Sequence, residues 1–160
     1  MLEVPIALLG CGTVGSGVAR LLTEDADYIA DRTGVKLVVR YVLAKEANPR
    51  AKQALSDATW VDSMDPILAD PDCNIVCELI GGDTFSLECS RKALAAGKAL
   101  VTANKAMLAK HGQELFPLAH ANDSCIGFEA SCAGGVPLFV SLRDGLVANR
   151  FSALYGILNG

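Results

Sequence analysis

The sequence predicts an α/β fold, a Rossmann-type doubly wound parallel sheet with helices on both of its faces. Short apolar strand patterns alternate with helical patterns along the 160 residues, which is typical of a parallel sheet. A glycine-rich loop from Gly10 to Gly15 directly follows the first strand pattern and opens the first helical one. A loop of this composition in this position is typical of dinucleotide-binding domains.

Four strands and three helices are expected in the first half of the chain. Apolar and β-branched runs predict strands over Pro5–Leu9, Val35–Leu43, Thr59–Val61 and Asn74–Ile80. Apolar residues at helical spacing predict a helix over Val14–Thr23. Short helices are expected over Lys52–Leu55 and from Asp65, which we assign as the N-cap with Pro66 at the first helical position.

The second half of the chain continues the same alternation. A helix over Ser86–Ala96 is closed by Gly97 just past its end. The next helix covers Lys105–Ala121 with interruptions at Gly112 and Pro117, and a last helix over Gly135–Val147 is weakened by Gly145. Strands are expected over Ala99–Thr102, Ser124–Glu129 and Phe151–Leu158.

A stretch of small residues at positions 130–135 suggests a hinge between two domains. We expect residues 1–134 to form a nucleotide-binding domain. Residues 135–160 are expected to form a linking helix and the first strand of a truncated second domain for substrate binding and dimerisation. Because the last strand pattern has no element after it to pack against, we expect the chain to be a fragment of a longer protein.

Composition excludes several classes of function. The chain is 51% hydrophobic and 20% charged with a net charge of −4, and without a basic stripe nucleic acid is an unfavourable partner. Its apolar runs are too short to cross a membrane, and no signal peptide pattern is present. Six cysteines form no C-x-x-C pair, which favours reduced thiols in a cytoplasmic protein over a metal or redox role.

Each glycine of the loop has an expected task. Gly10 permits a tight turn, Gly12 lets the backbone approach a pyrophosphate, and Gly15 allows close packing of helix and strand. The free N–H groups of the following helix attract phosphates. The alternative is a glycine-rich turn in another α/β fold.

Charges after the second strand bear on the choice of dinucleotide. Lys45 is the first charge past the apolar run and is suited to the 2′-phosphate of NADP, with Arg40 or Arg50 as assistants. Glu46 is suited to the 2′-hydroxyl of NAD. The lysine favours NADP, and NAD remains an alternative, as does a solvated loop lysine with no role in binding.

Lys105 follows the predicted strand Ala99–Thr102 by three residues. Ligands of open parallel sheets bind outside the carboxyl ends of the strands, so this lysine is expected to face the bound cofactor. A cation there is suited to chemistry on a carbonyl or carboxylate substrate. The alternative is a surface lysine at the start of a helix.

Five segments together resemble homoserine dehydrogenase: residues 7–18, 77–82, 101–106, 128–137 and 155–160. The most discriminating are T-A-N-K, which ends at Lys105, and E-A-x-x-x-G-G-x-P, which begins at Glu129. The resemblance implies reduction of L-aspartate 4-semialdehyde to L-homoserine with NAD(P)H, on the route to threonine and methionine. It also implies a small-molecule substrate and a homo-oligomer in the full-length protein.

Site residues follow from the resemblance and the loop together. Lys105 is the expected catalytic residue, which stabilises the alkoxide that forms from the carbonyl or relays its proton. Expected cofactor contacts are Gly10, Cys11, Gly12, Thr13, Val14, Gly15, Lys45, Gly81, Gly82 and Lys105. A sodium ion is implied at Glu129, Cys132, Gly134 and Val136, mostly through backbone carbonyls.

The resemblance also implies a limit on activity. A second catalytic lysine and acidic substrate ligands of the family have no match in these 160 residues, so we expect the chain to bind cofactor without turning substrate over. Two alternatives remain open: a non-catalytic module that senses NAD(P), and another semialdehyde or amino-acid dehydrogenase with a related first domain.

Overall fold

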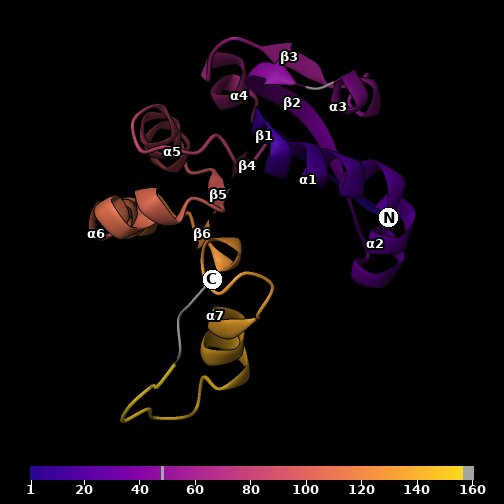
Figure 1. The fold of residues 1–160 in the computed structure, drawn as a ribbon. Helices are drawn as coiled ribbons and strands as arrows, with labels where there is room; N and C mark the ends of the chain where they lie inside the picture. Colours follow the sequence, from indigo (N-terminus) through magenta and orange to yellow (C-terminus); the bar gives the residue numbers. More distant parts are fainter. Residues whose placement is uncertain (48, 157–160) are drawn as a thin grey trace.

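A six-stranded parallel sheet is the centre of the computed structural model, which describes residues 1–47 and 49–156 (Figure 1). The strand order is β3-β2-β1-β4-β5-β6, and neighbouring strands pair in parallel. The strands are β1 (Leu2–Cys11), β2 (Val35–Ala47), β3 (Thr59–Val61), β4 (Ile75–Glu78), β5 (Ala99–Thr102) and β6 (Ile126–Gly127). The order reverses between β1 and β4, where ligands of doubly wound sheets bind. The predicted fold class is confirmed.

Helices cover both faces of this sheet, with α1 on one side and α5 and α6 on the other (Figure 1). The helices are α1 (Thr13–Glu24), α2 (Ala26–Thr33), α3 (Pro49–Ala54), α4 (Asp65–Ala69), α5 (Phe85–Ala95), α6 (Lys105–Ala121) and α7 (Leu138–Val140). A 3-10 turn covers Glu129–Ser131, and a π-type turn over Ser141–Gly145 follows α7.

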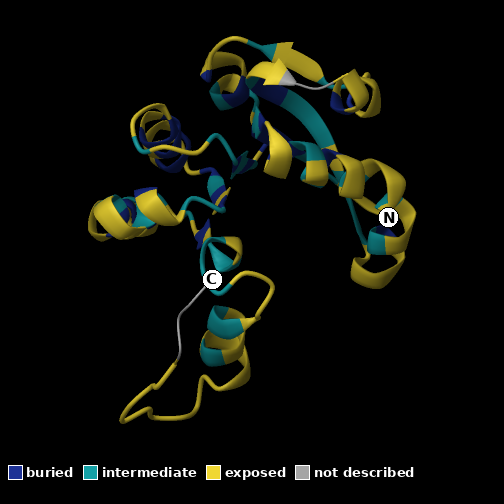
Figure 2. Cartoon of the chain, viewed as in Figure 1, coloured by how far each residue is buried: buried dark blue, intermediate teal, exposed yellow. Residues whose placement is uncertain are grey.

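Two cores form because successive residues of β1 point to opposite faces. Ala7 and Leu9 pack in a cluster with buried residues of α4, α5 and α6, whereas Leu8 packs in another with residues of α1 and α3. A strand covered on both faces has no polar side, which explains the continuous apolar run of β1. Figure 2 shows buried residues along the sheet and exposed residues on the outer faces of the helices.

Several predicted elements agree closely with the structure. The strands β3 and β5 have the predicted bounds, and α5 is shifted by one residue from the prediction. Gly97 follows α5 with a φ of +72°, the left-handed conformation that commonly ends a helix. The helix α6 is uninterrupted, contrary to the prediction of breaks at Gly112 and Pro117. Buried Leu115 and Ala119 hold it against the core, which offsets the hydrogen bond that proline cannot donate.

Two local predictions in the first half are wrong or incomplete. The residue that precedes α4 is Met64, not the predicted N-cap Asp65, which lies inside the helix. The helix α2 was not predicted from the sequence. In this helix Ala30 is the buried residue, so the apolar spacing that normally reveals a helix is weak.

The end of the chain departs most from prediction. The predicted helix over residues 135–147 is confined to α7 and the turn after it. Residues 151–156 form no strand, contrary to prediction, and the last two residues of that predicted strand lie outside the described ranges. In this segment Phe151, Leu154 and Tyr155 are exposed, so no neighbour among the described residues stabilises a strand. The domain boundary near residue 134 stays a prediction.

The structure also provides observations on membrane-spanning helices and on the cysteines. Within the described ranges, no helix is long and apolar enough to span a bilayer. All six cysteines are free thiols. Burial raises the pKa of both Cys77 and Cys89 to about 11, so these two stay protonated and unreactive near neutral pH.

Candidate functional site

Two cavities lie along the carboxyl edge of the sheet, beside the reversal point between β1 and β4. The larger has a volume of about 610 Å³, and the smaller one of about 260 Å³. The larger is lined by Gly10, Cys11, Gly12, Leu43, Ala44, Lys45, Glu46, Val61, Asp62, Leu79, Ile80 and Phe85. The smaller is lined by Val14, Leu79, Gly81, Ala103, Asn104, Lys105 and Ala106. Leu79 lines both cavities, so the loop after β4 borders each of them.

Backbone packing requires glycine at two positions of the loop. A Cβ atom on Gly10 would lie 2.6 Å from the carbonyl oxygen of Leu79, and Gly10 has a φ of +89°. A Cβ atom on Gly15 would lie 2.1 Å from the carbonyl oxygen of Gly10. Both glycines are therefore needed for the fold itself, in the tight turn and the close packing that the sequence predicts.

Gly12 differs from these two glycines. A Cβ atom there meets no protein atom within 4 Å, and its φ is −75°. Gly12 precedes α1, whose N-terminus has no side-chain cap and no acidic residue in its first turn. The unfilled N–H groups of such a helix end bind anions. The space over Gly12 is suited to a phosphate group of a ligand.

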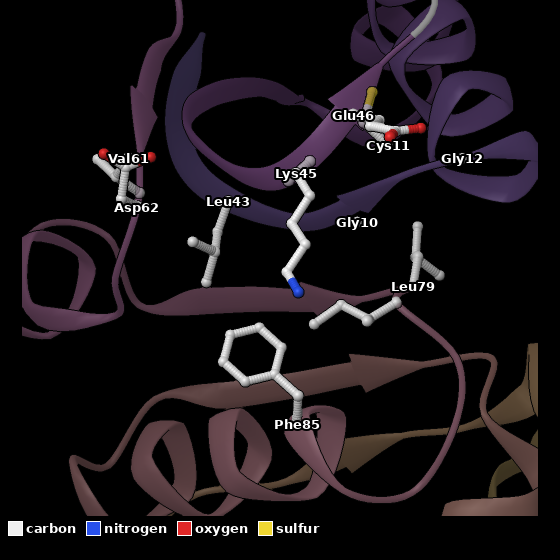
Figure 3. A pocket seen from close by; sticks show the side chains of 12 residues that line it. Gly10, Cys11, Gly12, Leu43, Lys45, Glu46, Val61, Asp62, Leu79 and Phe85 are labelled. Carbon is white, nitrogen blue, oxygen red and sulfur yellow. The ribbon is translucent and has the colours of Figure 1, made fainter.

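Lys45 and Glu46 both line the larger cavity, but in different places (Figure 3). The Lys45 side chain extends across the cavity toward Phe85, whereas Glu46 lies beside Cys11 and near Gly12. Both are exposed, and neither forms an ion pair with another described residue. With Asp62, which also lines it, the cavity presents one basic and two acidic residues to a ligand.

The two arginines named as assistants of Lys45 lie elsewhere. Arg40 donates a hydrogen bond of 2.8 Å to the carboxylate of Asp70, which lowers the pKa of Asp70 to about 2. Arg50 lines a separate cavity with Arg20 and Glu24 of α1. Neither arginine lines the larger cavity, so Lys45 is the only basic residue among the described residues that line it.

Lys105 begins α6 and lines the smaller cavity. The preceding residue, Asn104, caps this helix, because its side-chain oxygen accepts a hydrogen bond of 3.1 Å from the backbone N–H of Met107. A cation at a helix N-terminus opposes the helix dipole. Helix stability therefore does not explain a lysine at this position.

Most of the residues expected to contact the cofactor line one of the two cavities. Gly10, Cys11, Gly12 and Lys45 line the larger cavity, and Val14, Gly81 and Lys105 line the smaller. Thr13, Gly15 and Gly82 line neither. The apolar wall of the larger cavity, to which Leu43, Val61 and Phe85 contribute, was not predicted from the sequence. Their apolar character was visible, but nothing in the sequence shows that three elements converge on one cavity.

A buried acidic residue was also missed. Glu78, at the end of β4, is fully buried. It accepts hydrogen bonds from the backbone N–H groups of Ile80 (2.9 Å) and Gly81 (3.4 Å), and from the hydroxyl of Thr102 (2.6 Å). A charged residue inside an otherwise apolar strand run is a signal that was available in the sequence.

The residues proposed for sodium lie in the segment before α7. The carboxylate of Glu129 accepts bonds of 3.0 Å from the backbone N–H groups of Phe139 and Val140. The carbonyl groups of Glu129 and Val136 each accept one backbone bond, from Cys132 and Leu138. In the described ranges, no cluster of three acidic, histidine or cysteine side chains is suited to a metal ion. Backbone oxygens are the donors that this segment offers.

Comparison with known proteins gives a consistent result. The family model "Homoserine dehydrogenase, NAD binding domain" matches residues 10–129. Homoserine dehydrogenases of Neisseria gonorrhoeae and Pseudomonas aeruginosa are each 40% identical over 160 residues, all of this chain but 37% and 36% of theirs. The chain therefore spans a little over a third of the length of these relatives.

The solved structures that resemble this chain are also homoserine dehydrogenases. The crystal structure of a homoserine dehydrogenase from Thiobacillus denitrificans has a TM-score of 0.81 and 37% identity, over 92% of this chain and 34% of that one. A hyperthermophilic archaeal homoserine dehydrogenase in complex with NADPH has a TM-score of 0.72 over 92% of this chain. At 24% identity, this second likeness shows a shared fold.

The contrast between the loop glycines predicts separable effects. Gly12→Ala should lower the melting temperature by no more than about 4 °C, because the added methyl meets no protein atom and the cost is only that of alanine in place of glycine at an N-cap. It should weaken NADPH binding at least about tenfold, because the methyl occupies the space over the helix N-terminus. Thermal denaturation and fluorescence titration measure the two effects.

Gly17→Ala is the matched control, since an added Cβ at Gly17 in α1 also meets nothing within 4 Å and Gly17 lines neither of the two cavities. It should bind NADPH normally. Normal NADPH binding by the Gly12 variant as well would contradict the assignment of the space over Gly12.

Proposed function

This chain belongs to the homoserine dehydrogenase family, and from that premise we propose that it binds NADPH for the reduction of L-aspartate 4-semialdehyde to L-homoserine. The observation that carries the proposal is the pair of cavities that share the Leu79 loop. One is lined by the glycine loop and the other by Lys105. A dinucleotide that spans both would bring its nicotinamide to the lysine.

We assign the two halves of the cofactor by the chemistry of the walls. The larger cavity has an apolar wall suited to adenine, and the glycine loop beside it is suited to the pyrophosphate. The nicotinamide then lies in the smaller cavity, near Lys105. When bound, the reduced nicotinamide supplies the hydride that the aldehyde carbon accepts.

Lys105 is the proposed catalytic residue. As the aldehyde carbon accepts the hydride, its oxygen develops negative charge. The ammonium group of Lys105 is suited to hold this oxygen and to donate or relay the proton that completes the alcohol. Because the chain spans little more than a third of its relatives, we assign turnover to the full-length protein and cofactor binding to this chain.

Charge supports NADP over NAD as the preferred cofactor. Lys45 reaches into the larger cavity without an ion-pair partner among the described residues, and is thus available to a 2′-phosphate. Glu46 supports the alternative, since a carboxylate near the glycine loop is suited to the ribose hydroxyls of NAD. The position of the ammonium inside the cavity favours the first assignment.

A sodium ion is proposed in the segment from Glu129 to Val136. A hard monovalent cation prefers oxygen ligands, and the backbone carbonyls of Cys132 and Gly134 accept no hydrogen bond from the described residues. The departure of Cys132 from the aliphatic residue expected in the family does not disturb a carbonyl ligand. The Glu129 carboxylate is occupied as an acceptor for α7 and contributes charge at a distance.

A cytoplasmic location and a homo-oligomeric full-length protein complete the proposal. The first rests on the absence of disulfides among the described cysteines, the second on the family resemblance. Cell fractionation and light scattering on the full-length protein test them.

Lys45→Ala should remove the preference for NADPH. The variant loses a charge-assisted hydrogen bond to the 2′-phosphate, which corresponds to about a tenfold rise in the dissociation constant. Affinity for NADH should stay within about twofold, because NADH lacks that phosphate. Fluorescence titration with both nucleotides gives the ratio. Glu46→Gln is the neighbouring control and should keep the preference, and an unsubstituted protein that binds NADH at least as tightly as NADPH would refute the role of Lys45.

Lys105→Ala should lower kcat of the full-length enzyme by about 10²–10³-fold, the usual range for loss of a proton donor or an oxyanion-stabilising group. The dissociation constant for NADPH should change by less than about threefold. Lys92→Ala removes an exposed lysine of α5 that pairs with Glu88 and lines neither cavity, and serves as the control. A kcat equal to that of the unsubstituted enzyme would rule Lys105 out as the catalytic residue.

Sodium should stabilise the protein. At a concentration well above its dissociation constant, an ion that binds the folded state raises the melting temperature, here by about 2–4 °C. Thermal denaturation in sodium chloride and in choline chloride at equal ionic strength measures the difference. Identical melting temperatures in the two salts would show that no sodium site forms.

A further inference from the structure

Glu78 is a fully buried carboxylate at the end of β4, directly before Leu79, and it lines neither cavity. No described cation pairs with it. Burying a charge costs free energy unless hydrogen bonds replace its hydration. Three donors satisfy this carboxylate, two from the backbone and one from a hydroxyl. These three hydrogen bonds connect Glu78 to the loop after β4 and to the end of β5.

The two backbone donors set the orientation of the Leu79 loop. The N–H groups of Ile80 and Gly81 point at Glu78. In a trans peptide the preceding carbonyl points the opposite way, so the carbonyls of Leu79 and Ile80 point away from Glu78. The Leu79 carbonyl lies against Gly10, at the position where a side chain would clash. Glu78 thus fixes the loop against the glycine loop.

The third donor extends the network to the turn before α6. Thr102, fully buried at the end of β5, donates to Glu78 at 2.6 Å, and its oxygen accepts from the backbone N–H of Asn104 at 3.0 Å. The Asn104 side chain donates to the carbonyl of Gly82 at 2.5 Å. The residue immediately before Lys105 is therefore fixed both to β5 and to the loop after β4.

We propose that Glu78 is a positioning residue: through Thr102 it fixes the turn that carries Lys105 relative to the glycine loop. The inference rests on the proposed function, in which the smaller cavity receives the nicotinamide half of the cofactor. The carboxylate touches neither cofactor nor substrate. It acts by holding the loop after β4 and the turn after β5 in a fixed position relative to each other.

Thr102 offers a matched pair of substitutions. Thr102→Val keeps the shape of the side chain and removes the hydroxyl, whereas Thr102→Ser keeps the hydroxyl and removes a methyl group. Each variant of the full-length protein is titrated with NADPH and with 2′,5′-ADP, a fragment that lacks the nicotinamide half. The kcat and KM of the enzyme and its melting temperature are measured alongside.

Thr102→Val should raise the dissociation constant for NADPH about tenfold and lower kcat about tenfold, with 2′,5′-ADP binding within about twofold of the unsubstituted protein. Thr102→Ser should restore NADPH binding and kcat even where its melting temperature falls. A role in stability alone would lower the melting temperature of both variants and leave the constants of the folded protein unchanged, and that result overturns the proposal. Equal weakening of NADPH and 2′,5′-ADP also overturns it.

Glu78→Met provides a second test if the valine variant does not fold. It keeps about the length of the side chain and removes both oxygens, so the amides of Ile80 and Gly81 and the hydroxyl of Thr102 all lose their acceptor. It should reproduce the loss of NADPH binding, and unchanged binding and kcat would overturn the proposal. An unsubstituted protein that does not bind NADPH refutes the proposed function itself, which separates the two failures.

Discussion

The close approach of two backbone loops, after β1 and after β4, is the constraint on which the rest of the site depends. Gly10 and Leu79 meet at a distance that leaves no room for a side chain on residue 10, and Gly15 approaches Gly10 even more closely. These contacts place the N-terminus of α1 at the carboxyl edge of the sheet, between the two cavities. The proposed dinucleotide site at this point is a consequence of backbone packing, and the residues proposed to contact the cofactor lie around it.

The packing of the sheet fixes the strand ends from which these two loops begin. Because β1 is buried on both faces, its end cannot move without disturbing two cores at once. The loop after β4 is held by Glu78, and the turn after β5 by Thr102, so three neighbouring strand ends are joined in series. Apolar packing fixes the strands and a small polar network fixes the loops. Loops need polar partners because their backbone N–H groups do not take part in the hydrogen bonds between strands.

Sequence patterns predicted the parts of this arrangement that are local. Apolar runs located the strands, and the roles of Gly10 and Gly15 agree with the backbone contacts observed. Patterns failed where distant segments decide the outcome. Pro117 lies inside a helix because the core holds both sides of it, and α2 has too few buried residues to show a period. Phe85 and Glu78 are recognisable as part of a site once β4, β5 and α5 are placed in space.

The pair Lys45 and Glu46 shows why neighbouring charges in a sequence resist interpretation. A count of charges after the second strand gives one of each sign. Successive strand residues point in opposite directions, and in the structure the lysine reaches toward Phe85 while the glutamate lies by the glycine loop. The two charges therefore lie in different parts of the cavity and do not cancel. In the proposed function, the preference between NADP and NAD depends on the free energy cost of leaving one of these charges without a partner on the ligand. That cost depends on where each charge lies in the cavity and not on their order in the chain.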